Sequence, residues 1–320
     1  MTNPQKIERS ASGKVIVCGE HSVVYGRPAI AVPVSDLRAY AKAEPSKPGS
    51  QLRIVMPDLA RQTAFQSAPE EDPLAKICHL VLAHLNQLEP DLVLTITSDL
   101  PIGAGMGSGA AVTVAAARAL SASLGEELPP EVISEMTYEV EKIHHGTPSG
   151  IDNTVISWEQ PVYFVKDEPP ETFEIQRPFH LIIANSGISG STREAVTSVR
   201  QRWETSPDFY EILFDCIGSI ADAARDAIVT GDLKMLGSLL NENHKLLQKL
   251  GVSLPELDQL VDAARGAGAL GAKLTGAGQG GDIIALAPED RISAVEAALR
   301  EADAAQIWCT HVGPPGGKCE

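Results

Sequence analysis

Apolar positions recur along the chain with two spacings, which predict a mixture of strands and helices. Short β-branched or alternating runs favour strands, whereas apolar positions three and four apart favour helices. The segment 73–88 shows the helical spacing clearly, with Leu, Ile and Val on one face. The strands predicted in this way are 15–17, 29–34 (with 39–43 as an extension), 52–56, 92–97, 154–157, 162–165, 181–184, 272–275, 283–287 and 306–311.

Helices take up much of the remaining sequence, and their ends coincide with Gly and Pro residues. The predicted helices are 73–88, 108–124, 129–146, 191–203, 207–230, 232–250, 255–267 and 289–302. The 320 residues are enough for two domains of ordinary size. A boundary between about Pro161 and Pro178 predicts an N-terminal domain, 1–165, and a C-terminal domain, 166–320.

The charge balance narrows the class of ligand. The chain has 26 basic and 42 acidic side chains, which give a formal net charge of −16. Binding a nucleic acid or an anionic membrane normally takes a basic surface, so we expect neither as a partner. The polar start, 1–13, and the lack of a long apolar run predict a soluble, cytoplasmic protein. A small anionic ligand remains compatible with this composition.

One glycine-rich stretch lies between a predicted strand and an Ala-rich helix. Its glycines let the backbone approach a ligand closely, and the helix directs unpaired N–H groups and its positive dipole end toward the stretch. Together these features predict a phosphate-binding loop, although a tight strand-to-helix connection would use the same residues. The loop comprises Pro101, Ile102, Gly103, Ala104, Gly105, Met106, Gly107, Ser108, Gly109, Ala110 and Ala111.

A second glycine-rich loop, 273–281, separates two predicted strands. Four glycines in six positions are costly in conformational entropy, which favours close approach to a ligand or a neighbouring strand. A simple glycine-rich hairpin is the alternative.

Near the start of the chain, Lys14 stands at the beginning of a short apolar strand, 15–17, and Glu20 and His21 follow that strand. Lys14 either extends to solvent or is fixed by the sheet beside an anion.

Two carboxylates flank a sharp turn in the middle of the chain. Glu141 lies near the end of a predicted helix, and Asp152 follows a Gly-Thr-Pro-Ser-Gly turn. One could hold Mg²⁺, which prefers oxygen ligands, while the other accepts a proton. His144 and His145 raise the alternative of a transition metal, but adjacent histidines point apart on a helix.

These segments, in this order, resemble the GHMP small-molecule kinase superfamily. The resemblance rests on the segments 12–26, 101–111 and 273–281, and the acidic segment 145–153 is similar to that of mevalonate kinases. It implies an α+β, two-domain GHMP kinase fold. The N-terminal domain would resemble the second domain of ribosomal protein S5, the C-terminal domain would be ferredoxin-like, and ATP and substrate would meet in the cleft between them.

The resemblance also implies an activity: ATP-dependent phosphorylation of the primary C5 hydroxyl of mevalonate, in isoprenoid precursor synthesis, with Mg²⁺ as cofactor. Asp152 would accept the hydroxyl proton, and Lys14 would hold this aspartate ionised and lower the pKa of the hydroxyl. A homodimer is a family-level expectation. The metal would be held by Glu141 and Ser108, and the residues matching the substrate pocket are Lys14, Glu20, His21, Asp152, Thr192, Gly276, Ala277 and Gly278.

The sequence departs from the family pattern at three positions. Met106 replaces a Leu, Gly109 replaces a Ser whose hydroxyl often reaches Mg²⁺, and Gln279 replaces a Gly. Two rival functions stay open: a phosphomevalonate kinase or decarboxylase of the same pathway, and a ligand sensor without turnover. The first would need more cationic side chains than Lys14 and Arg193 in the matched segments. The second would not need the intact Lys14, Glu141 and Asp152.

Overall fold

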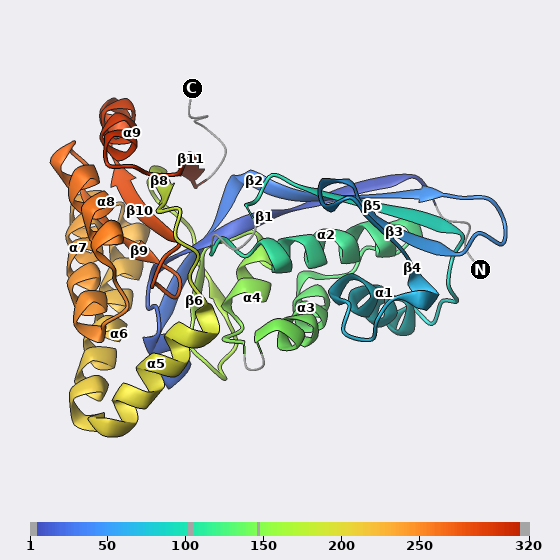
Figure 1. Cartoon of the computed structure of the whole chain (residues 1–320), viewed down its shortest axis with the longest axis horizontal. Coiled ribbons are helices and arrows are strands. Elements are labelled where there is room, and N and C mark those ends of the chain that lie inside the picture. Colours follow the sequence, from blue (N-terminus) through green and yellow to red (C-terminus); the bar gives the residue numbers. More distant parts are fainter. Residues whose placement is uncertain (1–4, 102–104, 146–147, 314–320) are drawn as a thin grey trace. The chain divides into compact units, whose positions relative to one another are not determined.

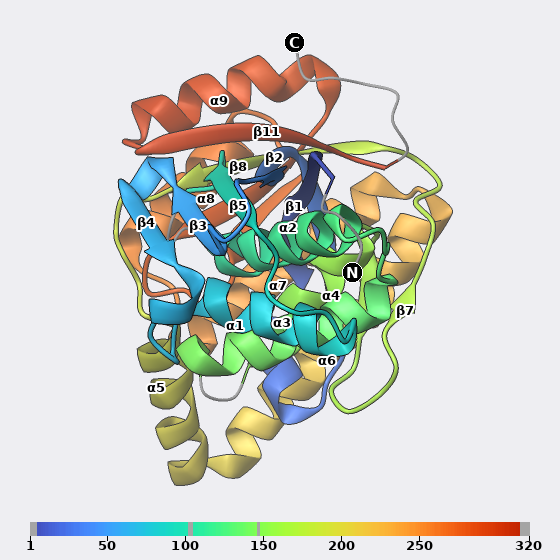
Figure 2. The same cartoon turned by 90° about the vertical axis from the view of Figure 1, so that its right-hand side faces the viewer.

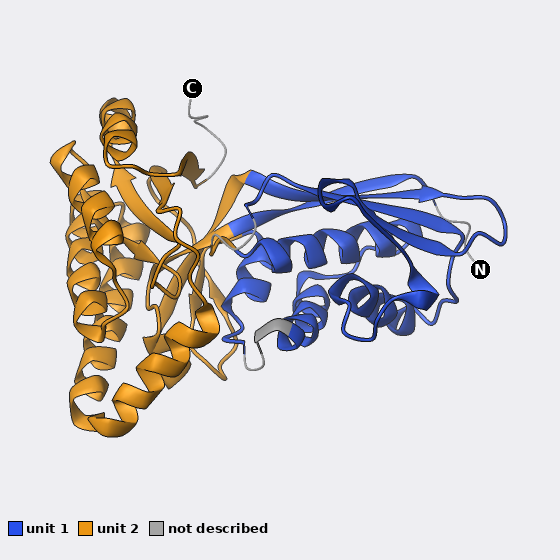
Figure 3. Cartoon of the chain, viewed as in Figure 1, with its two compact units in different colours: residues 1–13, 37–102, 107–159 blue, residues 14–36, 103–106, 160–320 orange. Residues whose placement is uncertain are grey.

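The protein is described from a computed structural model, in which residues 5–101, 105–145 and 148–313 are placed, with the side chains of 144 and 145 left aside. The chain forms two compact units (Figure 3). Unit 1 comprises residues 1–13, 37–102 and 107–159, and unit 2 comprises 14–36, 103–106 and 160–320. Each unit is therefore built from separate segments of the chain. The division of the sequence at residue 165 stays a prediction.

Unit 1 consists of sheet strands with helices packed on them (Figure 1). The strand order is β4-β3-β5-β2, in which β3 is parallel to β5 and the other neighbours are antiparallel. β1 pairs with β2, and both strands contribute residues to each unit. The strands are β1 (Ile7–Cys18), β2 (Ala29–Pro45), β3 (Leu52–Met56), β4 (Arg61–Ala64) and β5 (Leu92–Ser98).

The central helix of unit 1 is α2, and its buried position explains why the sequence of this helix is rich in alanine. Its small side chains are buried nearly all round, because α2 contacts β5 and three other helices. It begins at Ser108 directly after Gly107, whose φ of 70° is in the left-handed region that favours glycine. The helices of the unit are α1 (Pro73–His84), α2 (Ser108–Ser123), α3 (Pro130–His145) and α4 (Ile151–Trp158).

Unit 2 is built on a four-stranded antiparallel sheet with the order β11-β8-β10-β9. Its core joins apolar side chains of β8, β9 and β10 to those of α6, α7, α8 and α9. Figure 2 shows α9 beside β11, which it contacts. The elements are β6 (Val162–Phe164), β7 (Glu171–Thr172), β8 (Phe179–Asn185), α5 (Thr192–Thr205), α6 (Pro207–Thr230), α7 (Leu233–Leu250), α8 (Pro255–Gly266), β9 (Gly271–Thr275), β10 (Asp282–Ala287), α9 (Ile292–Glu301) and β11 (Gln306–Val312).

Within the described residues, four short 3-10 helices complete the secondary structure. They are η1 (Ser22–Tyr25), η2 (Pro57–Leu59), η3 (Phe65–Ser67) and η4 (Glu289–Arg291). Along the part of the chain that the structure describes, no helix is both long enough and apolar enough to cross a membrane.

The structure corrects one predicted strand. The segment 154–157 lies inside helix α4, although its Thr-Val-Ile-Ser sequence favours a strand. Gly150, with φ 92°, is the N-cap of the helix, and six of the eight helical residues are buried, Ile151, Val155 and Ile156 among them. Tertiary burial therefore outweighs the β-propensity of the segment. The short strands β4 and β7 were not predicted, because neither contains an apolar run.

The contact between α7 and β9 places several polar residues of the candidate site, and it depends on a close approach of two glycines. A Cβ on Gly237 would lie 2.6 Å from the backbone carbonyl carbon of Leu270, and a Cβ on Gly271 would lie 2.0 Å from the carbonyl oxygen of Gly237. No side chain fits at either position without moving the helix away from the strand.

We expect Gly237→Ala to lower the free energy of unfolding by about 1–3 kcal/mol or more, because the added methyl overpacks the contact with β9. Gly266→Ala is the matched control. Its Cβ would meet no atom within 4 Å, and the residue is helical. This control is expected to be neutral or to stabilise the protein by up to about 1 kcal/mol. Chemical denaturation of both variants measures the difference, and equal stabilities would contradict the close-approach argument.

Candidate active site

Lys14 lies in the interior of strand β1, not at its end. Only 4 % of the residue is exposed, and its Nζ donates a hydrogen bond to the carbonyl oxygen of Gly105 at 3.0 Å. The backbone N–H of Lys14 also donates to the carbonyl oxygen of Met106 at 3.0 Å. A lysine extending into solvent is therefore excluded. The ammonium group is fixed at the middle of the first glycine-rich loop, where a cation can attract phosphate.

Glu20 has a fully buried side chain that forms an ion pair with Lys273, which is equally buried. The second carboxylate oxygen accepts a hydrogen bond from Asn243 Nδ2 at 2.9 Å. Both oxygens of Glu20 are thus engaged by residues of β9 and α7. Contact between Glu20 and substrate stays a prediction, and the geometry shows Glu20 tying the end of β1 to the rest of unit 2.

His21 has a strained backbone and a neutral side chain. Its φ of 61° is unusual for a residue with a Cβ, and its Nε2 lies 2.8 Å from the carbonyl oxygen of Ala277. Burial lowers the pKa of His21 to about 4, against the opposing effect of the Ala277 hydrogen bond. Because a carbonyl accepts, the neutral ring carries its proton on Nε2, which leaves Nδ1 as an acceptor. The ring can therefore accept a hydrogen bond from a hydroxyl group.

The second glycine-rich loop, 273–281, packs closely against neighbouring backbone. A Cβ on Gly278 would lie 2.2 Å from the carbonyl oxygen of Val252, and a Cβ on Gly280 would lie 2.6 Å from that of Ile188. The simple hairpin is thus an incomplete explanation, because these glycines permit close approach to neighbouring loops. Gln279 has φ 56°, which explains why the family usually has glycine there.

In unit 1, the start of α2 lies beside the carboxylate of α3. Gly109 has no side chain, and a Cβ at this position would lie 3.7 Å from Oε1 of Glu141. Glu141 is 6 % exposed, while Ser108 is half-buried at the first position of α2. A carboxylate oxygen beside a helix N-terminus, with room for one more group, suits Mg²⁺, which binds few protein ligands and retains water and phosphate oxygens. The residues present therefore fit this cofactor.

Asp152 is the second residue of α4. The helix begins at Ile151, whose N–H donates to Ser149 Oγ at 3.4 Å, and Asp152 itself is half-buried. The N-terminus of a helix is a favourable place for a negative charge. The adjacent Asn153 donates from Nδ2 to Ser134 Oγ at 2.8 Å, which anchors α4 to α3. Asp152 is thus held on a short helix that packs against the helix of Glu141.

The remaining predicted residues fall into three groups. Thr192 is exposed at the first position of α5, and Gly276 is half-buried directly after β9. Met106, Ala110 and Ala111 are buried, and Pro101 is half-buried, so the side chains of the first three pack in the core. Ile102, Gly103 and Ala104 lie outside the described residues, as do the side chains of His144 and His145.

Sequence reasoning missed three buried polar residues that lie next to the predicted site. Lys273 and Asn243 are the partners of Glu20, and Asp282 begins β10 directly after the glycine-rich loop. Lys273 stands between Ala272 and Leu274 in a predicted strand, and Asp282 precedes an Ile-Ile pair. A charged residue inside an apolar strand was the available signal, but its partners are distant in sequence.

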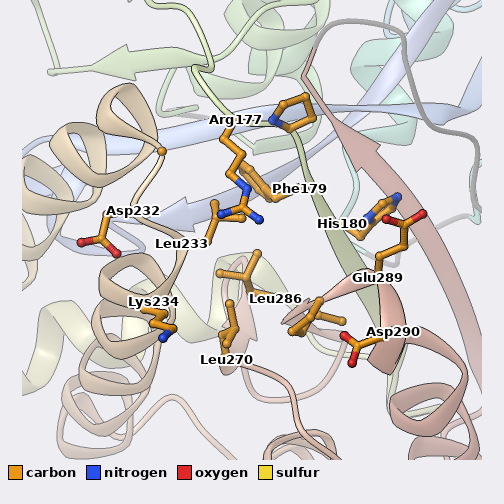
Figure 4. Close-up of a pocket in the computed structure, with 14 residues that line it drawn as sticks. Arg177, Phe179, His180, Asp232, Leu233, Lys234, Leu270, Leu286, Glu289 and Asp290 are labelled. Carbon is orange, nitrogen blue, oxygen red and sulfur yellow. The ribbon is translucent and has the colours of Figure 1, made fainter.

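A cavity of about 940 Å³ lies elsewhere in unit 2. Figure 4 shows Leu233, Leu270 and Leu286 between charged side chains of both signs. The cavity is lined by the start of β8 and the end of β10, whereas Asp282 and the second glycine-rich loop lie at the opposite ends of these strands. None of the predicted site residues lines it.

Comparisons with known proteins show which family the chain belongs to. The family model for the GHMP kinases N terminal domain matches residues 74–159, and the model for GHMP kinases C terminal matches residues 224–305. The chain is 38% identical to mevalonate kinase from Thermococcus sibiricus, over 89% of this chain and 90% of that protein. It is also 38% identical to mevalonate kinase from Pyrococcus abyssi, with the same coverage.

A solved structure is similar over nearly the whole chain. Mevalonate kinase from L. major in complex with R-mevalonate is 31% identical, with a TM-score of 0.83 and coverage of 99% of this chain and 100% of that one. The two-domain GHMP kinase fold expected from the sequence is thus confirmed, and the similarity extends over 89% or more of the chain. The chain belongs to the GHMP kinase family, and within that family it is similar to mevalonate kinases.

Proposed function

We propose that the protein is an ATP-dependent kinase that phosphorylates the C5 hydroxyl of mevalonate, giving 5-phosphomevalonate for isoprenoid precursor synthesis. The observation that carries the proposal is the buried Lys14, fixed at the glycine-rich loop of a chain that is 38% identical to mevalonate kinases. A buried ammonium group at such a loop can attract anionic ligands, and both ATP and mevalonate are anionic. The wider proposal includes a cytoplasmic location and a homodimer.

In the proposed reaction, Asp152 is the general base that accepts the proton of the substrate hydroxyl. Lys14 provides positive charge for the ionised aspartate and for the alkoxide that develops during attack on the γ-phosphate. His21 accepts a hydrogen bond at Nδ1 and so orients a substrate hydroxyl. Phosphoryl transfer depends mainly on positioning and charge stabilisation, which these three residues supply.

The phosphates of ATP are proposed to bind at the N-terminus of α2. The backbone N–H groups that follow Gly107 have no partner within the helix at this end, and the dipole favours an anion there. Glu141, with Ser108, would hold Mg²⁺ beside these phosphates. When bound, the metal neutralises charge on the β- and γ-phosphates. Because Gly109 contributes no hydroxyl, Glu141 is the main protein ligand in this proposal.

A panel of substrates tests the function directly. We expect ADP release with mevalonate and ATP, and no comparable release with phosphomevalonate, galactose or homoserine. Preferred turnover of phosphomevalonate would favour the sister kinase. Binding of mevalonate and ATP without ADP release would favour a ligand sensor, and either result would contradict the proposal.

Asp152→Asn preserves the shape of the side chain and removes the proton acceptor. We expect kcat to fall by at least about 10²-fold while the affinity for ATP changes little. Glu131→Gln is the control, because Glu131 is an exposed carboxylate in the first turn of α3. Steady-state kinetics and ATP titration give both quantities, and near-normal turnover in the Asn variant would rule out Asp152 as the base.

The metal proposal predicts different effects for two neighbouring changes. Glu141→Gln removes the main ligand charge, so the Mg²⁺ concentration for half-maximal rate should rise and kcat should fall. Gly109→Ser should be mild or should tighten metal binding, because φ is not left-handed and the new Cβ would lie at an ordinary 3.7 Å from Glu141. A Mg²⁺ titration of both variants measures this difference. An unchanged Mg²⁺ dependence in Glu141→Gln would contradict the assignment.

A further inference from the structure

Asp282 is a buried carboxyl group that the proposed reaction does not use. It is the first residue of β10, directly after the second glycine-rich loop, and 1 % of it is exposed. Its Oδ1 accepts a hydrogen bond from Asn185 Nδ2 at 2.6 Å. Its Oδ2 is buried and has no hydrogen-bond partner among the described residues. Such an atom is costly to bury, so its position calls for an explanation.

The unpartnered oxygen lies at the glycine-rich loop that holds Lys14. A Cβ on Gly105 would lie 4.0 Å from Asp282 Oδ2, and the carbonyl oxygen of the same glycine accepts from Lys14 Nζ at 3.0 Å. Gly105 has φ 73°, which glycine adopts readily. The ammonium group of Lys14 therefore contacts Gly105, and the carboxyl group of Asp282 lies near the same residue.

Among the described residues, few polar side chains face Asp282, and one of them, Lys14, is charged. Asn185 lies opposite it on β8, Thr275 lies opposite it on β9, and Lys14 on β1 acts on it electrostatically. Burial raises the pKa of Asp282 from its ordinary 3.8 to about 7, and the Asn185 hydrogen bond and the Lys14 charge oppose this rise. The carboxyl group can thus gain or lose its proton in the neutral range.

We propose that Asp282 is a positioning residue that acts through Lys14, and that the protonation state of Asp282 sets how much positive charge Lys14 presents to its ligands. This inference rests on the proposed function. With Asp282 neutral, the charge of Lys14 acts fully on the loop and on the reacting groups. With Asp282 ionised, the carboxylate offsets part of that charge, and stabilisation of the developing alkoxide weakens.

The activity test compares Asp282→Asn with the wild type across pH. Asn resembles the protonated carboxyl group, so the ratio of kcat, variant to wild type, should be near one at pH 5.5. The ratio should rise about three- to tenfold as pH passes through about 7. Taking the ratio cancels ionisations that both proteins share, including those of ATP. Asp36→Asn is the matched control, because Asp36 is an exposed carboxylate of the same unit that binds Thr310.

A second measurement needs no activity. Asp282 has a higher pKa in the folded than in the unfolded protein, so between pH 3.8 and about 7 the folded state retains a proton that the unfolded state loses. Wild-type stability therefore falls with rising pH over this range relative to Asp282→Asn, and the difference becomes constant above about pH 7. In a Lys14→Met background the opposing charge is lost, so the difference should become constant only at a higher pH.

The two measurements separate failure of this inference from failure of the proposed function. A constant kcat ratio over pH, or a stability difference that Lys14→Met leaves unshifted, would overturn the role of Asp282. Absence of turnover with mevalonate in the wild type would overturn the proposed function, while the stability measurement would still test the coupling of Asp282 to Lys14. If Asp282→Asn does not fold, Asp282→Ser provides the same comparison with a smaller neutral side chain.

Discussion

Unit 2, which carries most of the predicted substrate residues, depends on one buried ion pair, Glu20 with Lys273. Two charges removed from water cost much free energy unless each is paired and hydrogen-bonded, and here Asn243 occupies the second oxygen of Glu20. The pair links the end of β1 to β9 and α7. Losing one partner would leave the other charged and buried, so the three elements must come together in a single arrangement.

That arrangement explains the strained turn beside it. Gly19 has φ 102°, and a Cβ there would lie 2.4 Å from Cα of Ala29, so only glycine fits. His21, two residues later, has φ 61° and is held at its ring by Ala277. Strained conformations of this kind persist when the surrounding contacts determine them. The buried ion pair between these two positions supplies that constraint, while burial of the imidazole keeps it neutral with one acceptor.

The sequence predicted most of the secondary structure and the glycine-rich segments because these features are local. The spacing of apolar residues identifies α1 and α2, and glycine at 107 and 278 indicates a left-handed backbone that other residues rarely adopt. The ion pair was not predictable, because Lys273 and Glu20 are joined only by the fold. The helix at 154–157 was misjudged because β-branched residues favour strands until burial decides otherwise. Asp282 is a charged residue at the start of an apolar strand, and only its partners reveal its environment.

The most direct test of this account is a double-mutant cycle on Glu20 and Lys273. Free energies of unfolding are measured for Glu20→Gln, Lys273→Met and the double variant. If the pair is the constraint described, each single change costs about 3–5 kcal/mol, because a buried charge or amide loses its partner. The double change then costs at least about 2 kcal/mol less than the sum of the single changes. Additive losses would contradict the account.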